Sequence, residues 1–469
     1  MYDSAMPEEP YYPPRFCAGM SLRNFRGFEV SGNVPLAPLT FFVGPNSSGK
    51  SSLSDALLLI AQSGLASRSI PSQTPDWSGP LVDLGSFNDT VYRHLAKRTI
   101  GISIDYTADF LREPWRERKT KTTMDPAVRM TFTLGNSSDG EGRLRSLRLT
   151  DLKSGFHCQV NFGARSLSVR LDEETVIRRR NPLGVEAYYH IERLLMASLA
   201  RGIKVKRNRK YGSKSAWQRL QNFARFYFTM PHLRNSQRVS SGRAAPQRWY
   251  PASGTSVPAV RIASYAVFDS VNPRTIREET RKGSRAKRRS KETLSRTLRE
   301  LEIASTISDR RLSAYHSAIY VTDAITGVVS NLIDVGFGAS QVIPVIEACL
   351  SGAYGPLIVE QPEIHLHPKA QGTAAELLCQ TSRTRQVIVE THSVHFINHA
   401  RILVARGVLP PEHVIVNYVY RTARGSKIHT IPIDRNGDFT KEWPEGFFDE
   451  RYQDTLTLLE IKAAREEQD

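Results

Sequence analysis

Residues 44–51 decide the fold and read Gly44-Pro-Asn-Ser-Ser-Gly49-Lys50-Ser51, which fits the P-loop pattern G-x-x-x-x-G-K-S/T. The apolar run 39–43 before it indicates a strand, and residues 51–61 after it carry apolar side chains at helical spacing. In such a strand, loop and helix, backbone N–H groups surround nucleotide phosphates, the lysine adds positive charge, and the serine hydroxyl ligates Mg²⁺. The sequence therefore predicts ATP and Mg²⁺ as cofactors, held by Gly44, Asn46, Ser47, Ser48, Gly49, Lys50, Ser51 and Ser52.

A P-loop needs a carboxylate at the end of a second buried strand to hold the metal ion. Leu357-Ile-Val-Glu360 supplies one, because three apolar residues end in an acid and the chain then leaves the sheet at Pro362. A surface acid after a core strand is the plainer interpretation, but its pairing with the P-loop favours the metal site. Ser51 and Glu360 are therefore the expected metal ligands.

Two further motifs resemble those of ABC-type ATPases. Residues 334–341 include Gly338 and Ser340 and resemble the signature motif, in which a glycine-rich turn and a serine open a helix. Residues 387–393 include His392 and resemble the histidine switch at the end of a strand. The order of P-loop, signature, metal acid and switch histidine resembles that of the soluble ABC branch, which includes SMC and recombination-repair ATPases.

Within that branch, the chain is most similar to OLD-like ATPases of prokaryotic anti-phage defence, such as the ATPase subunits of the PARIS and Septu systems. Residues 360–368, 242–250 and 443–449 carry this resemblance. The branch's first strand resembles residues 22–28, which implies that Arg26 lies near the nucleotide. The resemblance also implies a head-to-tail homodimer or higher homo-oligomer, in which Ser340 of one copy reaches the γ-phosphate held by the other.

One residue departs from the ABC pattern. The residue after the metal acid is usually a glutamate that activates water, whereas here it is Gln361. An amide cannot accept a proton as a carboxylate does, although it can orient a water molecule, so hydrolysis is expected to be slow. Glu390, beside His392, is the first candidate for a substitute base and Glu363 is the second. The expected catalytic residues are Lys50, Glu360, Gln361, Glu390 and His392.

Two other patterns suggest metal sites but have plainer interpretations. Glu363, His365 and His367 alternate as zinc ligands on an extended segment would, yet the resemblance places them in a loop that crosses the dimer interface. Residues 434–445 have the spacing of a calcium loop, but Phe439 stands where that loop needs glycine. A tight turn is therefore favoured there.

The chain is strongly basic, with 64 Lys+Arg against 47 Asp+Glu and a net charge of +17. Residues 201–225 hold nine basic residues and no acid, and residues 271–300 hold eleven basic residues against four acids. Such runs bind nucleic acid, bind an acidic protein, or form solvated helix faces, and all three interpretations stay open.

A cytoplasmic location is expected. No apolar stretch approaches the roughly 18 to 20 residues that span a membrane, and residues 1–14 lack the basic and apolar regions of a signal peptide. Four widely spaced cysteines argue against a disulfide framework and a zinc ribbon.

The fold class expected is α/β: an ABC-type P-loop ATPase head with an antiparallel β subdomain and an inserted basic helical arm. Residues 18–25 and 39–43 are predicted to be paired strands, and alternation over residues 100–172 predicts the antiparallel sheet. Residues 184–228 and 284–328 have helical periodicity. Strands and helices alternate after residue 331, which predicts a mainly parallel sheet.

These patterns divide the chain into three parts. Residues 15–183 form the N-terminal part of the head, residues 184–328 the basic insertion, and residues 329–469 the C-terminal part with the signature, the metal acid and the switch histidine.

Three functions follow as hypotheses. In the first, ATP holds a sensor scaffold that controls a separate effector, a Toprim or HNH nuclease, with a phage protein or nucleic acid as trigger. In the second, the chain is an SMC-like DNA-binding ATPase, but the helical stretches are too short for a long coiled coil. In the third, it is itself a nuclease, but the 77 residues after His392 lack the acid cluster of two-metal cleavage.

Overall fold

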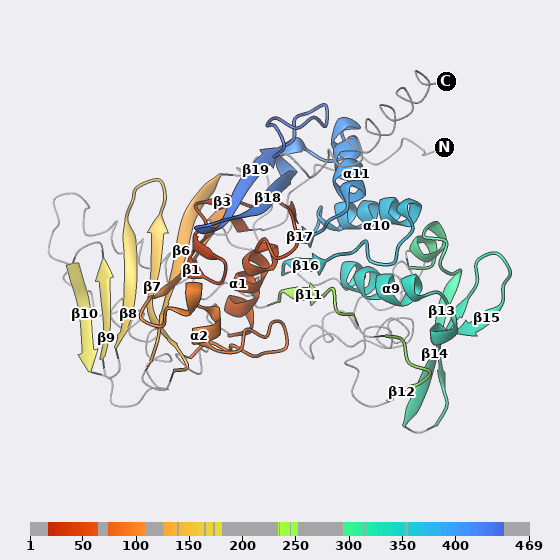
Figure 1. Cartoon of the computed structure of the whole chain (residues 1–469), viewed down its shortest axis with the longest axis horizontal. Helices are drawn as coiled ribbons and strands as arrows, with labels where there is room; N and C mark the ends of the chain where they lie inside the picture. Colours follow the sequence, from red (N-terminus) through yellow and green to blue (C-terminus); the bar gives the residue numbers. More distant parts are fainter. Residues whose placement is uncertain are drawn as a thin grey trace, which may run out of the picture.

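A computed structural model describes residues 17–63, 74–107, 125–137, 140–163, 166–171, 174–180, 233, 235–243, 245–251, 294–313, 315–351 and 355–444 (Figure 1). The helix predicted at residues 184–228, the basic run 201–225 and most of the run 271–300 lie outside the described residues.

The centre of the fold is a six-stranded sheet in the order β11-β16-β17-β4-β18-β19. All neighbours are parallel except the final hairpin pair, which confirms the predicted mainly parallel sheet. Every residue of the three middle strands β16, β17 and β4 is buried, as expected for strands covered on both faces. The strands are β4 (Leu39–Val43), β11 (Gln237–Val239), β16 (Leu357–Glu360), β17 (Val387–Glu390), β18 (Val414–Thr422) and β19 (Gly425–Pro432).

Two hydrophobic cores cover the two faces of this sheet. On one face, Phe42, Ile358 and Ile388 pack with helix α1 (Lys50–Gln62) and with the apolar face of the second sheet. On the other face, the alternate residues of the same strands pack with three helices, α9 (Phe337–Leu350), α10 (Pro368–Thr381) and α11 (Val394–Ala405). The P-loop helix thus lies between the two sheets, as Figure 1 shows.

The second sheet has nine strands and is antiparallel throughout, in the order β10-β9-β8-β7-β6-β5-β1-β2, with β3 paired to β1. This confirms the antiparallel subdomain. The short helices α2 (Phe87–Thr90) and η1 (Tyr92–His94) come directly before β5 in the chain. The strands are β1 (Cys17–Phe25), β2 (Phe28–Val30), β3 (Val34–Pro35), β5 (Ile100–Thr107), β6 (Pro126–Gly135), β7 (Arg143–Asp151), β8 (His157–Gly163), β9 (Ser166–Leu171) and β10 (Glu174–Arg180).

The predicted pairing of the first two long strands is wrong. β1 pairs with β5 in the antiparallel sheet, whereas β4 lies between β17 and β18 in the parallel sheet. All five residues of β4 are buried, so it needs a central position, whereas Ser21, Arg23 and Asn24 of β1 are half-buried or exposed.

The helix predicted across residues 284–328 is also wrong in part. Residues 294–300 are helical, but the chain then forms a small sheet in which Ile307, Ile319 and Val321 reach the core with the two-residue period of strands. In addition, β11 pairs with β16 in the central six-stranded sheet, although its residues fall within the predicted insertion. The small sheet contains β12 (Tyr250–Pro251), β13 (Thr306–Arg311), β14 (His316–Thr322) and β15 (Val329–Asn331).

Candidate functional site

The P-loop is packed tightly between β4 and the β18–β19 hairpin. Gly44 has φ 137°, and a Cβ on it would overlap the carbonyl oxygen of Val419 in β18. Gly49, the residue before α1, has φ 105°, and a Cβ there would lie 2.6 Å from Ser426 Oγ. Both glycines are therefore required by backbone conformation and by close contact.

Lys50 is held inside the loop that it closes. Its side chain is buried, and Nζ donates hydrogen bonds to the carbonyl oxygens of Gly44, at 3.0 Å, and Pro45, at 2.8 Å. Burial lowers the pKa of Lys50, and the nearby carboxylates of Glu390 and Glu363 oppose that shift. The ammonium group is thus fixed where the loop would surround phosphate groups.

A cavity of about 470 Å³ opens beside the P-loop, which is a volume in the usual range for small-molecule sites. Most of the predicted nucleotide contacts line it, whereas Gly44, Asn46, Gly338 and Ser340 do not. Its lining residues are Arg26, Gly27, Ser47, Ser48, Gly49, Lys50, Ser51, Ser52, Tyr92, Arg93, Arg421, Thr422, Ala423, Gly425 and Ser426.

Sequence reasoning missed two walls of this cavity, the helix η1 and the tip of the β18–β19 hairpin. Tyr92 Oη donates to the carbonyl oxygen of Arg424 at 3.1 Å, which ties η1 to the hairpin across 332 residues of sequence. No motif in either segment indicates a place beside the P-loop, because each wall depends on a contact with a residue far away in the sequence.

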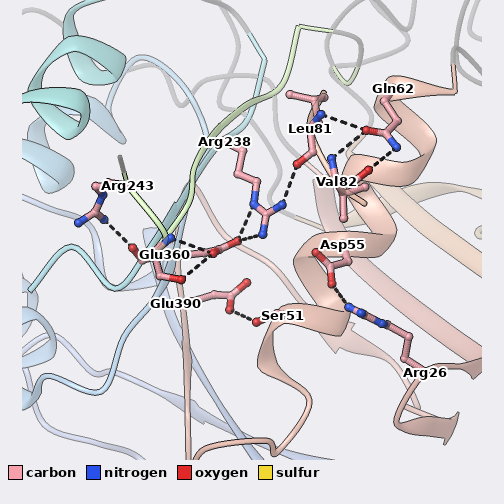
Figure 2. A network of polar contacts seen from close by, with 11 residues as sticks. Arg26, Ser51, Asp55, Gln62, Leu81, Val82, Arg238, Arg243, Glu360 and Glu390 are labelled. Atoms are coloured by element: carbon pink, nitrogen blue, oxygen red, sulfur yellow. Dashed lines mark hydrogen bonds and ion pairs between the residues drawn. The ribbon is translucent and has the colours of Figure 1, made fainter. Parts of the chain in front are cut away.

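Arg26 is positioned at the cavity by α1. Its guanidinium group forms an ion pair with Asp55, whose side chain is almost fully buried (Figure 2). Burial raises the pKa of Asp55 to about 6, although the Arg26 charge acts in the opposite direction. Arg26 lines the cavity beside the P-loop, and its contact with a nucleotide stays a prediction.

The two acids at the strand ends lie next to each other, but only one of them contacts the P-loop helix. Glu360 and Glu390 are paired in register on β16 and β17. Ser51 Oγ donates a hydrogen bond to Glu390 Oε2 at 2.7 Å. Burial raises the pKa of Glu390 to about 7, and the Glu360 carboxylate adds to the shift.

Glu360 is bound instead by β11 and the segment that follows it (Figure 2). Arg238 forms an ion pair with Glu360 Oε1 at 2.6 Å. The Ser241 backbone N–H donates to Oε2 at 3.1 Å, and Arg243 donates to the Glu360 backbone carbonyl at 2.6 Å. Sequence reasoning missed Arg238, which precedes Glu360 by 122 residues.

Gln361 and Glu363 follow in a tight turn beside His392. Gln361 has φ 44°, and its N–H donates to the Glu390 carbonyl at 2.6 Å. Both carboxylate oxygens of Glu363 are occupied, one by Thr391 Oγ1 at 2.8 Å and one by the His392 N–H at 2.7 Å. Burial raises the pKa of Glu363, whereas burial and the Lys50 charge lower the pKa of His392, so its imidazole is neutral at pH 7.

The signature-like segment opens α9, as predicted, but its serine points into the protein. Ser340 is only 6% exposed, and its Oγ accepts a hydrogen bond from Gln341 at 3.5 Å. Gly338 packs against the loop that contains His365, because a Cβ there would lie 2.6 Å from the His365 carbonyl oxygen. Gly336, the residue before α9, is exposed, and a Cβ on it would meet no atom within 4 Å.

The alternative metal patterns find no support in the part of the chain that the structure describes. No group of three His, Cys, Asp or Glu side chains is arranged there to hold a metal ion. His367 instead precedes α10 and accepts a hydrogen bond from the Lys369 N–H. Asp434 Oδ1 accepts from the N–H groups of Asn436 and Asp438, as in the predicted tight turn.

One family profile matches residues 39–123 and 206–398, which is more than half of the chain, and its description is "AAA domain, putative AbiEii toxin, Type IV TA system". The chain belongs to this AAA domain family. The matched residues of this AAA domain include the P-loop and both strand-end acids, so the chain contains a P-loop ATPase domain. A second profile, "Protein of unknown function (DUF3696)", matches residues 409–458 and thus the β18–β19 hairpin.

Other comparisons give weaker similarity to this AAA domain. None of the curated proteins matches the chain. Among solved structures, an SMC head bound to the C-winged helix domain of ScpA is 11% identical with a TM-score of 0.44, covering 90% of this chain and 98% of that one. The SMC head from Thermotoga maritima is 11% identical with a TM-score of 0.35, covering 89% and 99%.

Among the described residues, no helix is both long and apolar enough to cross a membrane.

Proposed function

We propose that the protein binds ATP, hydrolyses it slowly, and uses the bound nucleotide to hold a homo-oligomer that controls a separate effector in anti-phage defence. ATP binding and hydrolysis are supported by the cavity beside the P-loop. There Lys50 is fixed inside the loop, and Ser51 contacts the buried carboxylate of Glu390. These residues would hold ATP with Mg²⁺, which supplies positive charge against the phosphates.

Slow turnover is supported by the groups around the position of the attacking water. The residue after Glu360 is an amide, and the carboxylate of Glu363 already accepts two hydrogen bonds. His392 is neutral and half-buried, so it can hydrogen-bond a phosphate oxygen or a water without adding charge. The usual glutamate after the metal acid is therefore missing, and Glu390, the candidate substitute base, already accepts a hydrogen bond from Ser51, so ATP should stay bound for long periods.

The defence role is the finer part of this proposal. It is supported by the resemblance to OLD-like ATPases and by a family description that mentions a toxin of a type IV TA system. The effector would be a Toprim or HNH nuclease, and a phage protein or nucleic acid would be the trigger.

Turnover of Gln361→Glu tests the ATPase proposal. We expect wild-type phosphate release well below the roughly 10 s⁻¹ median for enzymes, and at least tenfold faster release from the variant, because a carboxylate can accept the proton of water. Steady-state phosphate release measures both, and Gln361→Asn, which keeps an amide, is the matched control. Fast wild-type hydrolysis, or equal rates for Glu and Asn variants, would contradict the proposal.

Gly336→Arg tests the oligomer. Its Cβ points into open space at the start of α9, so the variant should fold and bind ATP as one copy. The bulky charge beside the signature-like segment should weaken ATP-dependent dimers at least tenfold, as measured by light scattering at several protein concentrations. Gly336→Ala is the control and should assemble like the wild type. Equal assembly of all three proteins would exclude a head-to-tail interface at this segment.

A further inference from the structure

We propose that Glu390, rather than Glu360, is the carboxylate that binds Mg²⁺ together with Ser51, and that Arg238 keeps Glu360 in a structural role. This inference rests on the proposed ATP-binding function of the P-loop. Glu360 and Glu390 are the last residues of the neighbouring strands β16 and β17 and lie opposite each other in the sheet, yet we assign them different roles.

Strand order places Glu390 closer to the P-loop. β17 is hydrogen-bonded directly to β4, with Glu390 opposite Phe42, whereas β16 is one strand further away. Neighbouring strands lie about 4.8 Å apart, so the end of β16 is about 10 Å from the end of β4. Glu390 therefore reaches Ser51 directly, as Figure 2 shows.

The carboxylate of Glu390 is also not fully hydrogen-bonded. Its Oε2 accepts the Ser51 hydrogen bond, but its Oε1 is buried and has no hydrogen-bond partner among the described residues. The Ser54 hydroxyl is close enough to lower the pKa of Glu390, yet no hydrogen bond of normal geometry joins the two side chains. A buried acceptor without a partner is unfavourable, and a cation bound to this carboxylate would compensate for it.

The distance between the two proposed ligands suits Mg²⁺. Ser51 Oγ and Glu390 Oε2 are 2.7 Å apart. Adjacent oxygens in an octahedral Mg²⁺ site, with bonds of about 2.0–2.1 Å, are about 2.9 Å apart. Mg²⁺ typically takes one or two protein oxygens and completes its shell with phosphate oxygens and water, so one hydroxyl and one carboxylate are sufficient.

Glu360, by contrast, has its charge already compensated. Oε1 accepts from Arg238 and Oε2 from the Ser241 N–H and hydroxyl group. Arg238 is fixed further by a 2.8 Å hydrogen bond to the Leu81 carbonyl oxygen, and the Leu81 N–H donates to Gln62 in α1. If Glu360 moved to a metal ion, the mostly buried guanidinium group of Arg238 would lose its ion-pair partner.

Mn²⁺ binding in the presence of ADP tests this assignment without any turnover. Free Mn²⁺ would be titrated by electron paramagnetic resonance against the full chain and against Glu390→Gln and Glu360→Gln, each saturated with ADP. We expect Glu390→Gln to weaken Mn²⁺ binding at least tenfold and Glu360→Gln to stay within threefold of wild type. Loss in Glu360→Gln alone, or equal losses in both variants, would overturn the assignment.

Two controls keep the result interpretable. The double variant Glu360→Gln with Arg238→Gln removes the unpaired guanidinium charge, and we expect it to bind Mn²⁺ within threefold of wild type even if Glu360→Gln alone is unstable. Weak Mn²⁺ binding by this folded double variant would also overturn the assignment. ADP affinity in EDTA reports on the P-loop alone, so a wild type that binds no ADP there would refute the proposed ATPase function and this assignment with it.

Discussion

Replacing Lys50 by alanine should reduce ATP affinity at least about 100-fold, or about 2.7 kcal/mol. The ammonium group is the cation that the structure fixes inside the P-loop, where it donates to the Gly44 and Pro45 carbonyl oxygens. Without it, the γ-phosphate charge is left to backbone dipoles and Mg²⁺, and the two carbonyl groups repel the phosphates. Fluorescence titration with a labelled ATP analogue and Mg²⁺ gives the affinity.

The control for this experiment is Lys153→Ala, which removes the same charge from an exposed turn between β7 and β8. It should bind ATP like the wild type. If Lys50→Ala kept an affinity within threefold of that control, the P-loop assignment would be wrong.

Replacing Gly44 by alanine should destabilise the whole protein by about 3–5 kcal/mol. The new methyl group would overlap the Val419 carbonyl oxygen, which is backbone in β18 and cannot rotate away, and the φ of 137° is unfavourable for any L-residue. Thermal unfolding followed by circular dichroism should show a melting temperature lower by roughly 3–5 °C, because the entropy of unfolding of a chain this long is large.

Gly32→Ala separates the two causes of that loss. Gly32 also has a positive φ, 73°, but a Cβ on it would meet no atom within 4 Å. It should therefore cost only about 1 kcal/mol, the usual strain of a left-handed residue. Similar losses in the two variants would show that the P-loop is not pressed against β18 as the structure describes.

Local sequence signals predicted where helices and strands lie along the chain better than they predicted which strands pair with each other. The P-loop, α1, the strands that end in Glu360 and Glu390, and the helices after them all depend on motifs or short periodicity, and each was predicted at its place. The pairing of β1 with β5 depends on contacts between segments far apart in the sequence, and the place of β4 between β17 and β18 depends on contacts across hundreds of residues. Alternation along one strand shows that it has a partner but does not say which one.

The candidate site shows the same limit. Motif order indicated Glu360 as the metal acid, but it could not show that Arg238 on β11 forms an ion pair with that acid. The resemblance placed Ser340 at an interface between copies, whereas packing buries its side chain in one copy. The two walls of the cavity, η1 and the hairpin tip, come from segments that have no motif of their own.

The β18–β19 hairpin also bears on how the chain can be divided. The profile match that begins at residue 409 would suggest an appended module that could be removed or exchanged. Yet β18 is a neighbour of β4 in the central sheet, and the hairpin tip closes the cavity beside Ser47–Ser52. A fragment cut at residue 408 would lose a strand of its core and one side of its nucleotide pocket together. Swapping this segment between relatives would therefore exchange part of the nucleotide site and of the central sheet, so the boundary between the two profile matches is not a boundary between folding units.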